Sequence, residues 1–117
     1  MEKKALLSSL WIFVLINMIY ADILSLMDPV SHIRLIMAGK DIPPGGLIVG
    51  AFLMESAILM TFLPRILKPT LNKIITTLVV LLNTLAVIKG GSGDYYIFFA
   101  TVEVITMIAI VILTYVN

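Results

Sequence analysis

The chain has 117 residues, of which 61% are hydrophobic and 13% are charged, and its mean hydropathy is +1.13. A soluble domain carries about a quarter charged residues, so this composition excludes an ordinary soluble protein and indicates a chain surrounded mostly by lipid. The net charge of +1, without a basic tail, argues against a nucleic-acid partner, and the absence of cysteine excludes disulfides and cysteine-ligated metals.

Four apolar segments dominate the sequence. They lie at about 5–27, 45–63, 70–89 and 95–116. Each is about 20 residues long, enough to cross about 30 Å of hydrocarbon as a helix. A segment in lipid must satisfy its own backbone hydrogen bonds, and none of these runs shows the alternation of a barrel strand. The sequence therefore predicts an all-α membrane protein, a single domain over 1–117 formed by an up-down-up-down four-helix transmembrane bundle.

The connection at 28–44 is the longest one. Asp28 is a suitable N-cap, Pro29 fits the first helical position, and Gly39 is a suitable helix stop. We therefore expect a short helix near 29–38. Because it is too short to span, it should lie at the membrane interface or over the mouth of the bundle.

The connection at 64–73 is short and basic. Pro64 and Pro69 are expected to end the second span and begin the third. Arg65 and Lys68 are then placed to meet anionic lipid headgroups.

Lysines and arginines are distributed unevenly between the two sides of the predicted bundle. Five lie on the side of both termini and three on the opposite side: Lys3, Lys4, Arg65, Lys68 and Lys73 against Arg34, Lys40 and Lys89. Since cytoplasmic loops carry the excess of positive charge, this bias predicts that both termini are cytoplasmic.

Every predicted span brings a strongly polar side chain into the outer half or the middle of the membrane. These side chains are Asn17 and Asp22 in the first span, Glu55 in the second, Asn83 in the third and Glu103 in the fourth, and the candidate site also includes Tyr20. An ionisable group at the bilayer centre costs at least about 2.5 kcal/mol, so it should face the bundle interior. The residues are therefore expected to form an intramembrane site for a ligand or for protons.

Glu55 and Glu103 are the deepest carboxyls in this set. Desolvation and a neighbouring carboxyl both favour the neutral acid, so we expect at least one to be protonated, or the two to share a proton. Glu55 should point into the bundle, within reach of Glu103 or of Asp22 and Asn83. The alternative is a purely structural role, in which each interhelical hydrogen bond contributes about 0.6–2 kcal/mol.

Catalytic and metal-binding motifs are not recognisable. His32 is the only histidine, which excludes two-histidine metal sites and bis-histidine haem within one chain. No nucleophile–base pair is apparent. We therefore predict neither enzymatic activity nor a cofactor or metal.

Four stretches of the chain carry a resemblance to a known family: LSSLWIFVLINMIYADILSLM, MAGK, FLPRILKPTLNK and YYIFFATVEVI. They resemble a family of small bacterial or archaeal four-span membrane proteins known only as a domain of unknown function. The strongest marks are Trp11, Tyr20, Asp22, Gly39, Asn72, Tyr96, Phe98, Phe99 and Glu103. The resemblance implies an inner-membrane protein with four spans and implies no activity. The overall form is also similar to DoxX-like proteins, by analogy of fold alone.

Two functions fit these features. The preferred one is a small transporter- or channel-like bundle with a polar, carboxylate-containing track in its outer half. The alternative is a non-enzymatic binding or accessory protein that holds a lipid, a quinone or a small amphiphile in the bundle cavity. Proton coupling requires carboxyls that water can reach, whereas a lipid site needs only an apolar cleft with one polar end. The expected partners are the bilayer and a small molecule or ion, and a homo-oligomer is an open alternative.

Overall fold

The structure, a computed structural model, describes residues 2–29, 45–89 and 93–116. These residues form five helices and no strand: α1 (Lys3–Met27), α3 (Gly46–Leu59), α4 (Leu63–Ile66), α5 (Pro69–Lys89) and α6 (Asp94–Tyr115). The predicted all-α fold is therefore confirmed for the described part of the chain.

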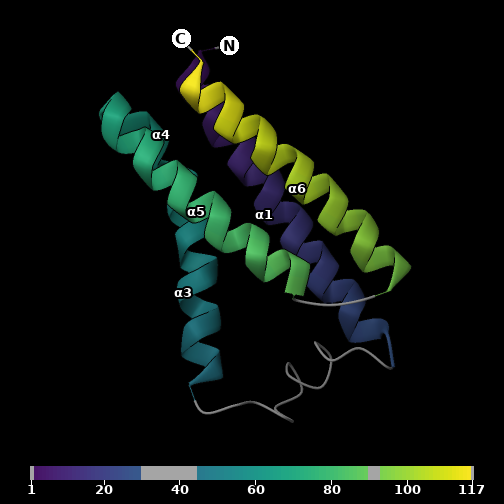
Figure 1. Cartoon of the computed structure of the whole chain (residues 1–117). Helices are drawn as coiled ribbons and strands as arrows, with labels where there is room; N and C mark the ends of the chain where they lie inside the picture. The colour runs from purple at the N-terminus through teal and green to yellow at the C-terminus, as the bar shows by residue number, and fades with distance from the viewer. Residues whose placement is uncertain (1, 30–44, 90–92, 117) are drawn as a thin grey trace.

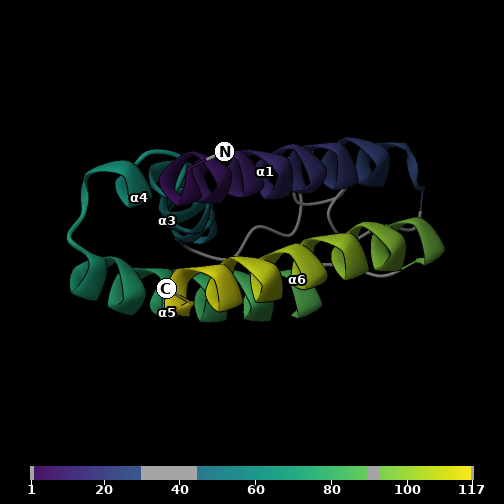
Figure 2. The same cartoon turned by 90° about the horizontal axis from the view of Figure 1, so that it is seen from above.

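The helices pack in two layers. Helices α1 and α6 lie side by side and antiparallel, and α5 packs against α6 (Figure 1). Seen from above, α1, α3 and α4 form one layer and α5 and α6 the other (Figure 2). The two ends of the described chain meet at one end of the bundle, where the Lys3 ammonium donates hydrogen bonds to the backbone carbonyls of Thr114, at 3.3 Å, and Val116.

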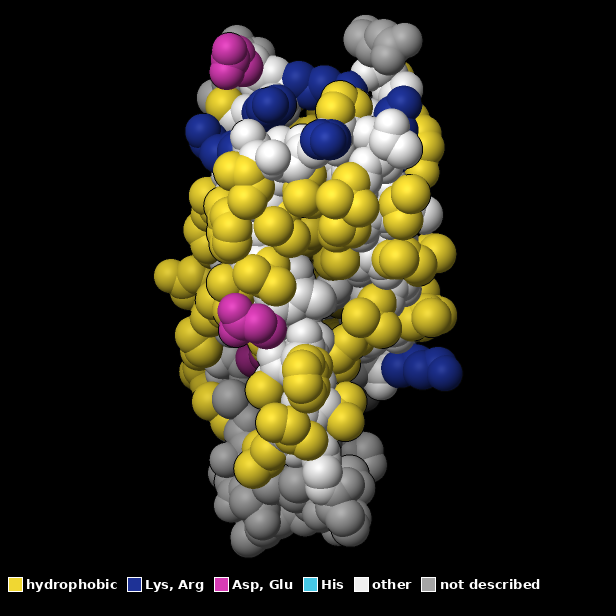
Figure 3. Space-filling model, turned by 90° about the vertical axis from the view of Figure 1, so that its left-hand side faces the viewer, with side chains coloured by type: hydrophobic (Ala, Val, Ile, Leu, Met, Phe, Trp, Pro, Cys, Tyr) yellow, Lys and Arg dark blue, Asp and Glu magenta, His cyan; other side chains and the backbone are white. Residues whose placement is uncertain are grey.

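Three of the described helices, α1, α5 and α6, are long and apolar enough to cross a membrane. They have 25, 21 and 22 residues, and their bounds lie within two residues of the predicted spans. These helices carry exposed isoleucine and leucine side chains. On the face that Figure 3 shows, hydrophobic side chains form a broad band. These features indicate a membrane protein, while the identity of the membrane and the orientation stay predictions.

The second predicted span differs from the structure. The prediction of a continuous helix over 45–63 is wrong. Helix α3 ends at Leu59 after 14 residues, and a separate short helix, α4, follows it. Pro64, in the first turn of α4, explains the break. A proline lacks the N–H group that a helix interior needs, and its ring clashes with the carbonyl four residues earlier, here that of Met60.

Hydrogen bonds hold the break between α3 and α4 in place. The Ser8 hydroxyl of α1 donates to the backbone carbonyl of Thr61, and the Thr61 hydroxyl donates to the carbonyl of Ile58 at 2.7 Å. The Ile58 carbonyl also accepts from the Thr61 backbone N–H at 3.0 Å, so backbone and side chain of Thr61 both bond to the end of α3. The break is therefore a fixed part of the packing against α1.

A tightly packed apolar cluster fills the half of the bundle nearer the chain termini. We call it the apolar plug; its members are Trp11, Val14, Met60, Met107 and Ile110, all of which are fully buried. They come from α1, from the break after α3 and from the C-terminal half of α6. Because protein cores pack without voids, the plug closes this half of the bundle.

Part of the longest connection lies outside the described residues. Asp28 directly follows α1, and its backbone N–H donates to the Ser25 carbonyl at 3.3 Å. The short helix expected near 29–38 falls almost wholly outside the described residues, as do Gly39 and His32.

Candidate functional site

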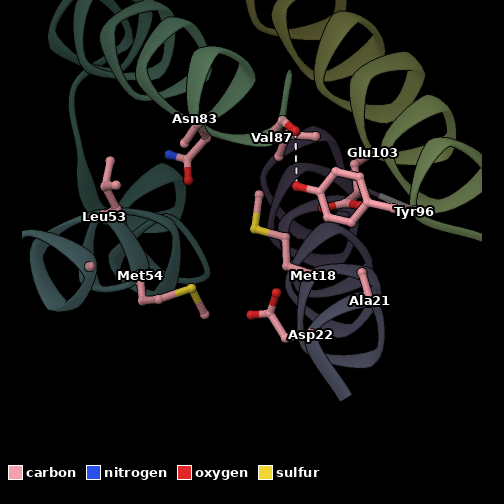
Figure 4. Close-up of a pocket in the computed structure, with 11 residues that line it drawn as sticks. Met18, Ala21, Asp22, Leu53, Met54, Asn83, Val87, Tyr96 and Glu103 are labelled. Carbon is pink, nitrogen blue, oxygen red and sulfur yellow. Dashed lines mark hydrogen bonds between the residues drawn. The ribbon is translucent and has the colours of Figure 1, made fainter. Parts of the chain in front are cut away.

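A cavity of about 230 Å³ lies between α1, α3, α5 and α6, in the half of the bundle away from the chain termini (Figure 4). Its polar lining consists of Asp22, Asn83, Tyr96 and Glu103. The rest of the lining is apolar and consists of Met18, Ala21, Gly50, Leu53, Met54, Ala86 and Val87. Helices α1, α3, α5 and α6 therefore all contribute to one site with polar and apolar walls.

Glu103 is the most enclosed acidic group of the cavity. Its side chain is only 3% exposed, and it lies behind the ring of Tyr96 (Figure 4). Helical spacing explains this position, since Met107 and Ile110 follow it by four and seven residues and are buried on the same face of α6. Among the described residues, none forms a hydrogen bond or an ion pair with the Glu103 carboxyl.

Asp22 is the second acidic group. It is half-buried on α1, next to Ala21 and one turn after Met18, and its carboxyl points from α1 toward α3 (Figure 4). It too has no hydrogen-bond partner among the described residues, and the described lining of the cavity contains no lysine or arginine. The described residues also contain no cluster of three His, Cys, Asp or Glu side chains that could hold a metal. The described lining of the cavity is thus acidic and contains no positively charged side chain.

Tyr96 connects α6 to α5 at the edge of the cavity. Its hydroxyl donates to the backbone carbonyl of Val87 at 2.9 Å, and the residue is 8% exposed (Figure 4). Val87 lies in the last turn of α5, where backbone carbonyls have no N–H donor within the helix, so the tyrosine hydroxyl supplies a donor to one of them. This contact holds the Tyr96 ring against the cavity.

Asn83 ties α5 to α3. Its amide group donates to the Ser56 hydroxyl at 3.1 Å and to the Val79 carbonyl at 2.9 Å. The side chain is 3% exposed and lines the cavity. Asn83 therefore makes an interhelical hydrogen bond and also presents polar atoms at the site.

Comparison with known protein families identifies the family of the chain. The model of a family described as a family of unknown function, DUF6326, matches residues 1–116. The chain belongs to the DUF6326 family. This confirms the resemblance to an uncharacterised family, whereas the likeness to DoxX proteins and the bacterial or archaeal source stay predictions. No curated protein and no solved structure matches the chain.

Three candidate residues of this DUF6326 protein come together as predicted, and three do not. Asp22, Asn83 and Glu103 all line the cavity. Asn17, Tyr20 and Glu55 do not line it. The amide of Asn17 donates at 2.8 Å to the Phe13 carbonyl of its own helix, and Tyr20 is 57% exposed.

The expected inward orientation of Glu55 is wrong. The face of α3 that turns to the bundle carries Gly50, Leu53, Met54 and Ala57, and Glu55 lies on the exposed face. Its depth along the helix matches that of the cavity, but each residue turns the helix by about 100° and depth says nothing about that rotation. Glu55 therefore does not lie beside Glu103 in this protein.

The cavity also contains residues that sequence reasoning did not select. Tyr96 precedes Glu103 by seven residues, two helical turns on one face, and Met18 precedes Asp22 by four. That spacing is a signal that could have identified them. Met54 faces the cavity from α3, although the site predicted from the sequence includes its neighbour Glu55 instead. The two side chains point about 100° apart around the helix.

Proposed function

We propose that this DUF6326 protein binds a small amphiphilic cation inside the membrane, between Asp22 and Glu103. The observation that carries this proposal is the Glu103 carboxyl, which is buried, lines the cavity and has no partner among the described residues. A buried acidic group without hydrogen bonds or counter-charge is costly. A bound cation would offset that cost.

The size and walls of the cavity suit a small organic molecule. Its volume of about 230 Å³ exceeds the about 150 Å³ of an apolar cavity that accommodates benzene. Met18 and Met54 contribute flexible, polarisable side chains that adapt to the shape of a ligand. The ring of Tyr96 can add a cation–π contact to an ammonium group. These features favour an amine or a quaternary ammonium group on a short apolar body.

The direct test is binding of benzyltrimethylammonium to the protein in lipid nanodiscs, measured by calorimetry. Neopentylbenzene is a matched neutral control, because it has nearly the same shape with carbon in place of the charged nitrogen. We expect the cation to bind, and Glu103→Gln and Asp22→Asn to weaken its binding. Equal binding of the two compounds would contradict the proposal.

Transport is the second candidate function, and the apolar plug favours it over an open channel. The cavity occupies one half of the bundle and the plug closes the other half. This is the arrangement expected of one end state in alternating access, where a fixed central site opens to one side at a time. A continuous pore would need a polar path past Trp11 and Met107, both of which are fully buried.

Uptake into proteoliposomes separates transport from binding. A transporter should accumulate radiolabelled benzyltrimethylammonium faster than empty liposomes do, and Glu103→Gln should reduce uptake to the level of empty liposomes. Binding in nanodiscs without uptake into proteoliposomes would support ligand binding as the function and would contradict transport.

A further inference from the structure

A second cavity, of about 210 Å³, lies at the opposite end of the bundle, where the chain termini meet. We call it the basic pocket. Its charged and polar lining consists of Lys3, Lys4, Asn72, Lys73 and Thr114, from α1, α5 and α6. None of the described residues that line it carries a carboxylate. The basic pocket therefore concentrates three positive charges around one hollow.

Its surroundings add to this positive charge. Arg65 and Lys68 lie exposed in and beside α4, and most of the lysine and arginine side chains seen in Figure 3 gather at this end of the molecule. Glu2 is the acidic residue nearest in sequence to Lys3 and Lys4, and it does not line the pocket.

Two of the three lysines are held in place by contacts that do not neutralise them. The Lys3 ammonium donates to the Thr114 and Val116 carbonyls, which leaves further capacity because an ammonium has three donors. The Lys73 ammonium lies 5.7 Å from the centre of the Tyr115 ring. Both charges are thus positioned while they stay available to an anion.

Asn72 supplies an unused donor inside the basic pocket. Its side chain is only 9% exposed, and its carbonyl oxygen accepts a hydrogen bond from the Thr76 hydroxyl at 3.2 Å. The Asn72 amide nitrogen has no acceptor among the described residues. Asn72 also lies in the first turn of α5, which begins at Pro69 and directs free N–H groups and the positive end of its dipole toward this end of the bundle.

We infer that the basic pocket binds a phosphate group, either in a phospholipid headgroup or as free phosphate. Ammonium groups, amide donors and a helix N-terminus are the groups with which proteins bind phosphate. The headgroup source fits the position of the pocket at the edge of the hydrophobic band, where Ile66 and Leu71 are exposed beside it. This inference concerns the end of the bundle opposite the proposed cation site and does not depend on that proposal.

The test uses the purified full-length protein and native mass spectrometry. It compares phosphatidylglycerol with diacylglycerol of the same acyl chains, which lacks the phosphate, and includes a separate titration with inorganic phosphate. We expect the protein to retain phosphatidylglycerol at least fivefold better than diacylglycerol. Binding of inorganic phosphate alone would also support the site and would identify free phosphate as its ligand.

Matched variants decide whether the pocket itself is responsible. Lys73→Gln and Lys68→Gln remove the same charge at the same end, but only Lys73 lines the pocket. Asn72→Asp keeps the acceptor for Thr76, removes the amide donors and adds a negative charge. We expect Lys73→Gln and Asn72→Asp to abolish the preference for the phosphate-containing ligand, and Lys68→Gln to keep at least half of it. Equal losses in Lys73→Gln and Lys68→Gln would overturn the inference, and so would an unmodified protein that shows neither a preference for phosphatidylglycerol nor binding of inorganic phosphate.

Discussion

Glu55 and Glu103 show that a residue's rotational position around its helix decides whether its side chain is buried or exposed. Both carboxyls interrupt apolar helices at similar depth, but Glu103 shares its face with the buried Met107, whereas the residues one turn on either side of Glu55, Ala51 and Leu59, are exposed. The sequence indicates depth through distance from the helix end. It does not indicate rotation when every face of the helix is apolar, as in α3.

The two glutamates should therefore respond differently to the same substitution. Glu103→Gln should weaken binding of benzyltrimethylammonium about tenfold or more, because opposite charges about 6 Å apart attract by about 3 kcal/mol at an effective dielectric constant of about 20. Glu55→Gln should change the affinity by less than about twofold, since Glu55 does not line the cavity. Calorimetry in nanodiscs measures both. A larger loss in Glu55→Gln would show that the cavity is not the binding site.

Glu55 also provides a test of what surrounds the outer face of α3. If lipid covers this face, Glu55→Leu should raise the midpoint of thermal unfolding by about 4 °C or more, because a carboxyl in contact with hydrocarbon is unfavourable. Ala51→Leu, one turn away on the same exposed face, is a control for added apolar surface. A lower midpoint in Glu55→Leu would instead indicate that a second copy of the chain pairs with this carboxyl.

At the scale of the elements, composition predicts α1, α5 and α6 well and α3 poorly. The three long helices are continuous apolar runs without an internal proline, so length alone gives their bounds. In the second segment, the apolar run continues past Leu59 and hides the helix end. The sequence predicts that the span ends at Pro64. The helix ends earlier, at Leu59, because the proline ring clashes with the carbonyl four residues before it, that of Met60.

Pro64→Ala tests this explanation of the break. The substitution restores a backbone N–H and removes the clash, so α3 should extend across residues 60–64 and their amide hydrogens should exchange more slowly. Hydrogen exchange with mass spectrometry on peptides that cover this segment measures the effect. Unchanged exchange would mean that the Ser8–Thr61 contact, rather than the proline, maintains the break.

The candidate site was predictable to the extent that its residues are polar in an apolar helix. Asp22, Asn83 and Glu103 stand out in the sequence for that reason, and all three line the cavity. Tyr96 contributes to the family resemblance but is not among the predicted site residues, because a tyrosine near a helix end is equally typical of the membrane interface. Its role depends on the Val87 carbonyl of another helix, a tertiary contact that no local pattern contains.

At the scale of the whole molecule, the bundle has two chemically different ends separated by the apolar plug. The acidic cavity lies in one half, and the basic pocket lies where the termini meet. The excess of lysine and arginine at the latter end predicts that it faces the cytoplasm. Fluorescent-protein fusions at the C-terminus should therefore be bright, and alkaline phosphatase fusions at the same position inactive; the opposite pattern would reverse the predicted orientation.

Trp11 offers a reporter for the state of the plug. It is the only tryptophan of the chain, it is fully buried, and its indole N–H has no hydrogen-bond partner in the part of the chain that the structure describes. If the protein transports the bound cation, the plug must open, and ligand addition should shift the Trp11 emission to longer wavelength as water reaches the ring. An unchanged spectrum at saturating ligand would favour binding without transport.

The central claim is that a cation lies against the Glu103 carboxyl, and a solid-state NMR distance tests it most directly. The measurement uses ¹⁵N-labelled benzyltrimethylammonium and protein labelled with ¹³C at the glutamate side-chain carboxyl, with Glu103→Gln to assign the signal. We predict dipolar dephasing that places the nitrogen within about 6 Å of the Glu103 carboxyl carbon, the range in which opposite charges interact strongly. Dephasing of another glutamate, or none at saturating ligand, would contradict the account.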